Sequence, residues 1–219
     1  MGDSKHRYGV LLLALSVTFS FEGIAGPGDL QRATGTVLIG ATLMLALYAA
    51  EVATDLLRIA GALTVATVGG VLIATIAGKG SAVNAIAAIA DGLLISLAPP
   101  AIVIGLLRDL RETRTVTVTI VAGVLCLYLL VGLFFAFVYG AIQSLVQMPF
   151  FANGQEATPA HAVYFSFVTM TTTGYGDFTA RTNVGRTLAT TEALLGQIYL
   201  VTVVAAIVGR LVPRGAGSK

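Results

Sequence analysis

Six long apolar stretches constrain what this chain can fold into. A helix that spans a membrane needs about 20 predominantly apolar residues, and the stretches run over residues 8–23, 34–50, 57–77, 82–107, 116–142 and 186–208. The 219 residues are 56% hydrophobic and 11% charged, whereas about 25% of the residues in an average soluble domain are charged. The sequence therefore predicts an all-α integral membrane protein with six transmembrane helices, which has the lipid bilayer as a partner.

The boundary between the second and third stretches carries neither Gly nor Pro. We place it at Glu51, Asp55 and Arg58, because charged side chains are costly at bilayer depth. A single bent helix that leaves the membrane and returns is the alternative.

Lys and Arg in the short loops indicate the orientation, because cytoplasmic loops carry an excess of them. With a cytoplasmic N-terminus, and leaving out the tail after residue 210, seven basic residues lie inside and four lie outside. The inner set is Lys5, Arg7, Arg58, Arg108, Arg111, Arg114 and Arg210, and the outer set is Arg32, Lys79, Arg181 and Arg186. Both termini are therefore expected on the cytoplasmic side.

Several classes of function find no support in the sequence. The net charge of +2 is too small for a broad nucleic-acid-binding surface. Cys126 is the lone cysteine, and His6 and His161 show no metal-ligand spacing. No nucleophile, base and orienting acid occur together at a helix end. We therefore expect neither an enzyme nor an organic cofactor.

The basic segment near Arg108 divides the chain. We predict a four-helix domain over residues 1–107, a cytoplasmic linker over 108–115 and a two-span unit over 116–210. Residues 211–219 form a tail that resembles, at Leu211-Val212-Pro213-Arg214-Gly215, a protease site for removing purification tags. We expect part of that tail to be artificial and exclude it from functional reasoning.

The two C-terminal spans are joined by more than forty residues, a length that usually indicates function. Residues 150–156 have the polar, Gly- and Asn-bearing character of an exposed turret. Thr158-Pro159 then predicts a helix start, because Thr caps free N–H groups and Pro suits the first helical position. The helix through Val168 is too short to cross the membrane, so we expect it to enter from outside and stop halfway.

The run Thr172-Thr173-Gly174-Tyr175-Gly176-Asp177 follows that helix. It resembles the selectivity filter of tetrameric pore-loop potassium channels, with Thr173 where Val is most familiar. The resemblance implies a prokaryotic plasma-membrane channel and a homotetramer around a central pore. Its re-entrant pore helix and filter loop lie between the fifth and sixth helices.

In such a filter, backbone carbonyls from four chains replace the hydration shell of K⁺. Aiming them at one axis requires alternating backbone conformations that are open mainly to glycine. The resemblance implies that K⁺ is coordinated by Thr172, Thr173, Gly174, Tyr175 and Gly176, with the first four donating the metal-binding carbonyls.

Three residues are expected to support the filter, namely Thr171, Asp177 and Val168. The family places Glu at the position of Val168 in some members, as a partner for the aspartate. The hydrogen bonding of Asp177 is therefore open at this point.

In the last span, Gly196 lies at the spacing of a hinge glycine, and close helix packing is the alternative. As a hinge, it predicts that Gly196→Ala lowers open probability at little cost to assembly. Glu192, one turn earlier, is expected near the back of the filter or a neighbouring helix, with a pore-facing position as the alternative.

The first four stretches resemble a voltage-gated channel in layout alone. A sensor helix carries Arg or Lys at every third position, but none occurs between Lys79 and Arg108. Asp91 lies in this span, and Pro99-Pro100 should kink it. We expect no strong voltage sensor, and the gating stimulus stays open.

The function that the sequence predicts is passive, K⁺-selective conduction, with K⁺ as the bound ion. The alternatives are a less selective cation channel and a potassium transporter subunit of the same superfamily. Such transporters carry four degenerate filters in one long chain, whereas this chain has one complete filter. The packing of the first four spans, on their own pore unit or on a neighbour's, is open.

Overall fold

The computed structural model describes residues 4–24, 26, 28–52, 54–76, 95–113, 117–146 and 148–211. Apart from one isolated β-bridge, the regular structure in this part of the chain is helical. The helices are α1 (Ser4–Ile24), α2 (Asp29–Ala49), α3 (Thr54–Ile76), α5 (Ala98–Thr113), α6 (Val118–Leu145), α7 (Pro159–Met170) and α8 (Asn183–Leu211). For these residues, the prediction of an all-helical chain is confirmed.

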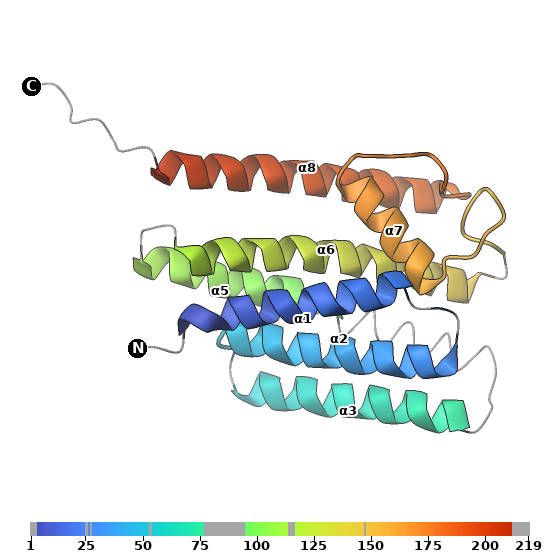
Figure 1. Cartoon of the computed structure of the whole chain (residues 1–219), viewed down its shortest axis with the longest axis horizontal. Helices are drawn as coiled ribbons and strands as arrows, with labels where there is room; N and C mark the ends of the chain where they lie inside the picture. The colour runs from blue at the N-terminus through green and yellow to red at the C-terminus, as the bar shows by residue number, and fades with distance from the viewer. Residues whose placement is uncertain are drawn as a thin grey trace, which may run out of the picture.

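The long helices run up and down beside one another (Figure 1). The start of α1 and the end of α8 lie at the same end of the molecule, and the loops around α7 lie at the other. The short helix α7 is inclined to the others and bridges from α6 to α8 (Figure 1). This arrangement agrees with the prediction that both termini lie on the same side of the membrane.

The uncertain boundary between the second and third apolar stretches is a tight turn between two helices. Glu51 lies in this turn with a φ of 51°, and Val52 N–H donates to the Leu47 carbonyl at 3.2 Å. The Glu51 carboxylate pairs with Arg7 of α1 and lies 3.7 Å from Arg108 of α5. The turn between α2 and α3 therefore also contacts α1 and α5 at one end of the molecule. The alternative of one bent helix is wrong.

The fourth apolar stretch differs from its predicted bounds. Pro99 and Pro100 lie in the first turn of α5, where backbone N–H groups have no helical acceptor to lose. The helix continues to Thr113, so most of the predicted linker at 108–115 is helical. Residues 77–94, with Asp91, and the tail residues 212–219 lie outside the described residues.

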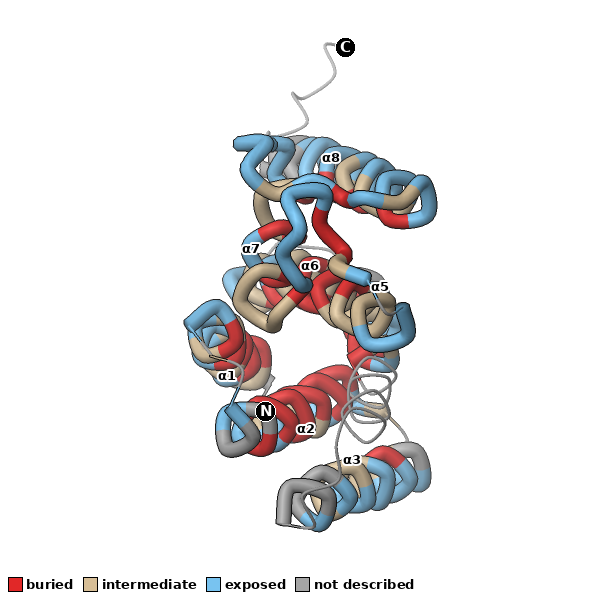
Figure 2. The backbone as a smooth tube through the Cα atoms, turned by 90° about the vertical axis from the view of Figure 1, so that its right-hand side faces the viewer, coloured by how far each residue is buried: buried red, intermediate tan, exposed pale blue. Residues whose placement is uncertain are grey.

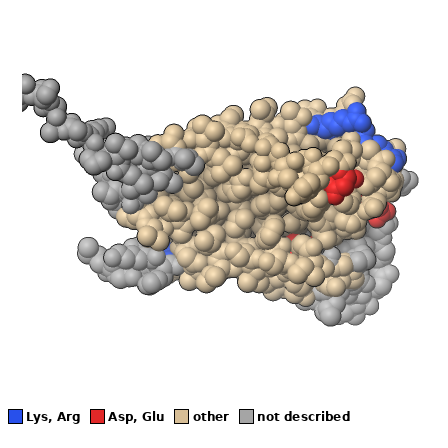
Figure 3. Space-filling view, turned by 45° about the horizontal axis from the view of Figure 1, so that its top comes forward, with Lys and Arg blue, Asp and Glu red and all other residues tan. Residues whose placement is uncertain are grey.

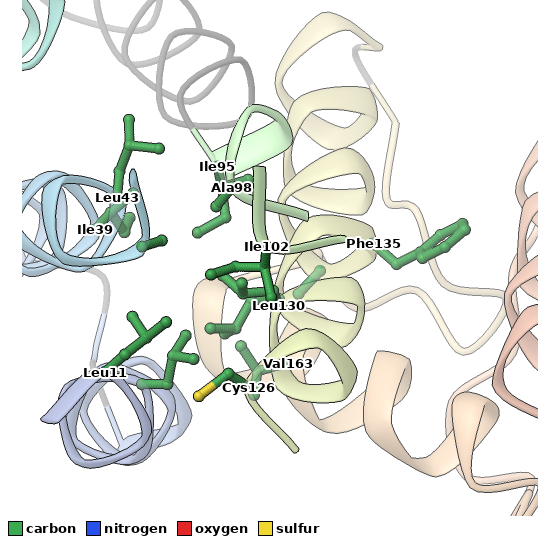
Figure 4. Packing of buried hydrophobic residues seen from close by; sticks show 14 of the residues in the cluster. Leu11, Ile39, Leu43, Ile95, Ala98, Ile102, Cys126, Leu130, Phe135 and Val163 are labelled. Carbon is green, nitrogen blue, oxygen red and sulfur yellow. The ribbon is translucent and has the colours of Figure 1, made fainter. Parts of the chain in front are cut away.

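A hydrophobic core forms where α1, α2, α5 and α6 converge. Figure 4 shows Leu11, Leu43, Ile102 and Leu130 pointing toward one another, whereas Phe135 points away on the opposite side of α6. The core continues onto α7, because the rings of Phe19 in α1 and Phe167 in α7 meet edge to face at 4.6 Å. The N-terminal helices are thus packed directly on the C-terminal unit of their own chain.

The outer surface of the helices is apolar. Buried residues face inward on α1, α2, α5 and α6, while α3 and α8 are largely exposed (Figure 2). On the face drawn in Figure 3, charged side chains gather mostly at one end and the broad flank is largely uncharged. Among the described residues, α1 and α6 combine the length and apolar composition of a membrane span, and α2, α3 and α5 contain shorter apolar stretches. These features are those of an integral membrane protein, and the full set of six spans stays a prediction.

Leu130→Ala tests this core. Leu130 is 0% exposed, so its truncation leaves a cavity and should cost about 2–5 kcal/mol of stability. Leu125 on the same helix is 49% exposed, so Leu125→Ala, the matched control, should cost much less in a detergent or lipid environment. Thermal unfolding of the purified protein measures both, and equal losses would contradict the packing described here.

Candidate functional site

The helix α7 begins as the sequence predicts. Thr158 is the N-cap, and its hydroxyl accepts from the backbone N–H of His161 at 3.3 Å, with Pro159 in the first helical position. The helix has 12 residues and ends at Met170. Its last turn is hydrogen-bonded to the predicted filter. The Val168 carbonyl accepts from the N–H groups of Thr173 and Gly174 at 3.0 and 3.2 Å.

The filter segment alternates in backbone conformation. Its positive φ angles fall at every second residue: 56° at Thr172, 52° at Gly174 and 81° at Gly176. Such an alternation allows successive carbonyls to face the same side, which a regular strand cannot do. The sequence indicated the two glycines but not Thr172. A β-branched residue with positive φ is a genuine outlier of the kind found at functional sites.

The hydroxyl of Thr171 braces the start of the filter. It donates to the Phe167 carbonyl at 2.7 Å and lies 2.9 Å from the hydroxyl of Thr173. Thr171 and, through its carbonyl, Val168 thus both contact the filter segment. Their role in supporting a filter stays a prediction.

Asp177 is held by a residue that the sequence analysis missed. The Tyr164 hydroxyl donates to Asp177 Oδ2 at 2.8 Å, and Asn153 Nδ2 donates to the Asp177 carbonyl at 3.0 Å. Tyr164 lies one turn before Val168 on α7. It provides the hydrogen-bond donor to Asp177 that the apolar side chain of Val168 lacks. Its ring also stacks on that of Tyr175, with centroids 6.5 Å apart.

The hydrogen bond to the Asp177 carboxylate raises the pKa of the Tyr164 phenol, with a smaller contribution from desolvation. The phenol therefore stays protonated as a donor. The signal that could have found it is the four-residue spacing from Val168, which places both residues on one face of a helix.

The predicted turret is exposed only over residues 152–156. Phe150 and Phe151 are buried, and the ring of Phe151 packs edge to face on Phe165 of α7 at 5.3 Å. The two phenylalanines are therefore anchors, which corrects the prediction that the whole segment is exposed. Gln143 closes the loop, because its side-chain oxygen accepts from the N–H groups of Phe150 and Ala157 at 2.8 and 3.1 Å.

The helix α8 contacts the filter region along one face. A Cβ on Gly196 would collide with the Met170 carbonyl and lie 2.6 Å from Met170 Cγ. The next residue, Gln197, donates from Nε2 to the Thr172 hydroxyl at 2.9 Å. The helix runs unbroken through Gly196. Close packing, the alternative that the sequence left open, therefore has direct support in this contact, and the hinge stays a prediction.

Glu192 lies behind α7, as expected. Its side chain is 0% exposed. It forms hydrogen bonds with the hydroxyl of Tyr139 of α6, at 2.6 Å, and with the hydroxyl of Ser166 of α7. The alternative of a pore-facing Glu192 does not agree with this burial.

One comparison with known proteins points to the same region. The protein-family model described as "Ion channel" matches residues 123–212, which include α7, the filter segment and most of α6 and α8. Because residues 123–212 are similar to this family, we refer to them below as the ion-channel domain. Together with the relative described next, this match confirms the resemblance to pore-loop potassium channels.

A relative of this chain comes from Methanocaldococcus jannaschii and is named "Probable potassium channel protein 2". It is 49% identical over 47 residues, which make up 20% of this chain and 14% of that relative's length. No solved structure matches the chain.

Tyr164→Phe tests the anchor of the ion-channel domain. The substitution keeps the ring and removes the donor to Asp177, so we expect the outer end of the filter to loosen and currents to decline faster during a maintained potential. Tyr128→Phe is the matched control, because the Tyr128 hydroxyl has no hydrogen-bond partner among the described residues. A decline unchanged in Tyr164→Phe and also in Asp177→Asn would contradict the anchoring role.

The substitution Gly196→Ala distinguishes a role of Gly196 in close helix packing from a role as a hinge. Because the added methyl group meets the Met170 carbonyl, we expect a lower melting temperature of the assembled protein as well as reduced conduction. Gly140→Ala on α6 is the control, since a Cβ there has nothing within 4 Å. Unchanged thermal stability together with a lower open probability would support the hinge instead.

Proposed function

We propose that this protein is a potassium-selective channel that conducts K⁺ passively through a fourfold filter. The observation that carries the proposal is the alternating backbone of Thr172, Gly174 and Gly176 within the run Thr-Thr-Gly-Tyr-Gly. Carbonyls that face one axis can replace the hydration shell of K⁺ with little cost. The ion ligands in this proposal are Thr172, Thr173, Gly174, Tyr175 and Gly176, and K⁺ is the only bound ion that the function requires.

A homotetramer follows from the single filter strand of each chain. Residues 171–177 are exposed on the isolated chain, and Tyr175 is 72% exposed. Large apolar side chains of α8 are exposed as well, namely Val184, Leu194, Leu195, Ile198 and Val201. Four copies around one axis would cover this face and complete each ion cage.

The orientation that we propose places the filter outside and both termini in the cytoplasm of a prokaryotic cell. The pairs of Arg7 and Arg108 with Glu51 lie at the end opposite the filter, which agrees with an excess of basic residues inside. All six apolar stretches then cross the plasma membrane.

Strong voltage gating is not part of the proposal. Each elementary charge that crosses the field contributes about 2.3 kcal/mol per 100 mV, and steep gating needs three or four such charges per subunit. The span between Lys79 and Arg108 has no basic residue to provide them. The N-terminal helices act in this proposal as a support of the pore, and no enzymatic activity or organic cofactor is assigned.

Reversal potentials in mixed potassium and sodium solutions test the proposal. We expect a strong preference for K⁺ in the purified parent protein, and its loss in Gly176→Asp, because a side chain at a φ of 81° is strained and disturbs the filter. Gly154→Asp is the matched control, since Gly154 also has a positive φ, of 85°, but lies in the turret.

The outcomes separate the competing functions. Conduction without a preference for K⁺ in the parent would favour the less selective cation channel. Saturable transport by a protein whose mass in detergent is not that of four chains would favour a transporter subunit.

A further inference from the structure

Three helices of the ion-channel domain meet at one buried polar cluster. Glu192 projects from α8, Tyr139 from α6 and Ser166 from α7, and each of these side chains is 0% exposed. The Tyr139 hydroxyl lies 2.6 Å from Glu192 Oε2, and the Ser166 hydroxyl contacts Glu192 Oε1. The same Ser166 hydroxyl lies 2.6 Å from the carbonyl of Gly132 in α6.

The number of hydrogens in this cluster determines its protonation. A carbonyl oxygen can only accept a hydrogen bond. Ser166 must therefore donate its single hydroxyl hydrogen to the Gly132 carbonyl. The Tyr139 hydroxyl likewise donates its one hydrogen to Glu192 Oε2. No hydrogen is then left between Ser166 Oγ and Glu192 Oε1, unless the carboxyl group of Glu192 is protonated and donates its own. An ionised carboxylate would bring two acceptor oxygens together, which is repulsive.

The surroundings of Glu192 agree with a neutral side chain. Among the described residues, no Lys or Arg forms a salt bridge with Glu192. A buried carboxylate without a cation is far more costly than a buried, hydrogen-bonded neutral acid. The neutral acid satisfies every contact of the cluster: Glu192 donates to Ser166, Ser166 donates to Gly132, and Tyr139 donates to Glu192.

We propose that Glu192 is a protonated carboxylic acid that positions the pore helix α7 between α6 and α8. It lies four residues before Gly196, which packs against the Met170 carbonyl at the end of α7. The inner helix thus fixes α7 at two points, one polar and one by close contact. Glu192 is a positioning residue, since it acts on the filter through α7.

The titratable groups of the helices that pack on α8 are few. On α6 they are Cys126, Tyr128 and Tyr139, and on α7 they are His161 and Tyr164. Of these, Tyr139 bonds Glu192, whereas His161 contacts the Glu156 carbonyl and Tyr164 bonds Asp177. A pH dependence that Glu192→Gln removes can therefore be assigned to Glu192.

Infrared spectroscopy of the purified full chain tests the protonation without any assumption about conduction. The difference spectrum between the parent and Glu192→Gln at neutral pH should contain the carbonyl stretching band of a protonated carboxyl group. Ser166→Ala should shift that band, because the acid loses its acceptor. Glu156→Gln, in the exposed turret, is the control and should remove no such band. A difference spectrum with only carboxylate bands overturns the proposal.

Thermal stability provides a second test. The amide of Gln can donate to Ser166 and accept from Tyr139, so Glu192→Gln should melt near the parent. Glu192→Leu has a similar size but no hydrogen bonds, so it should melt clearly lower. If Glu192→Gln is as destabilised as Glu192→Leu, the neutral-acid assignment is wrong.

The third test rests on the proposed function. If the protein conducts K⁺, alkaline solution should reduce the current of the parent as the hydrogen is lost, and Glu192→Gln should keep its current. A parallel loss in both proteins contradicts the positioning role. If the parent does not conduct at any pH, the proposed function fails, while the infrared and melting results still decide the state of Glu192.

Discussion

The structure depends on holding a stretch of irregular backbone in place. Residues 172–176 leave the end of α7 with alternating signs of φ, so a regular ladder of hydrogen bonds cannot stabilise them. Irregular backbone at membrane depth is tolerated only where protein or a water-filled cavity satisfies it. The stability of this segment must therefore come from the side chains and helices around it.

That support reaches the filter from several directions. Tyr164 bonds Asp177 at its outer end, Thr171 and the Val168 carbonyl hold its inner end, and Gln197 reaches Thr172 from α8. Behind it, α7 is wedged between α6 and α8 by the cluster around Glu192. The predicted filter segment is thus positioned by one short helix, and that helix is positioned by its neighbours.

The N-terminal helices take part in this support. The contact of Phe19 with Phe167 places α1 against α7, and the core around Leu130 joins α1, α2 and α5 to α6. The prediction of a four-helix domain over residues 1–107 rested on the basic segment near Arg108, which divides the sequence into two units. In this chain the apolar faces of the N-terminal helices and of α6 and α7 pack on each other.

Patterns that act locally were readable from the sequence. Apolar length predicted the helices, Thr158-Pro159 predicted the start of α7, and the glycine spacing of the filter predicted two of its three positive φ angles. The charges at Glu51, Asp55 and Arg58 correctly placed a break that no Gly or Pro marks. Each of these signals depends on neighbours within a few residues, which is why the linear order suffices.

Contacts between distant segments were decided only by the tertiary structure. The anchoring of Phe150 and Phe151 and the contact of Gly196 with Met170 join residues that no sequence pattern brings together. The same holds for Glu192: the sequence places it near the filter, but its three-way hydrogen bonding exists only because α6, α7 and α8 converge there. Local composition determined that this chain forms membrane helices around a filter motif. Packing determined which side chains hold that motif, because hydrogen bonds and close contacts depend on distances in space.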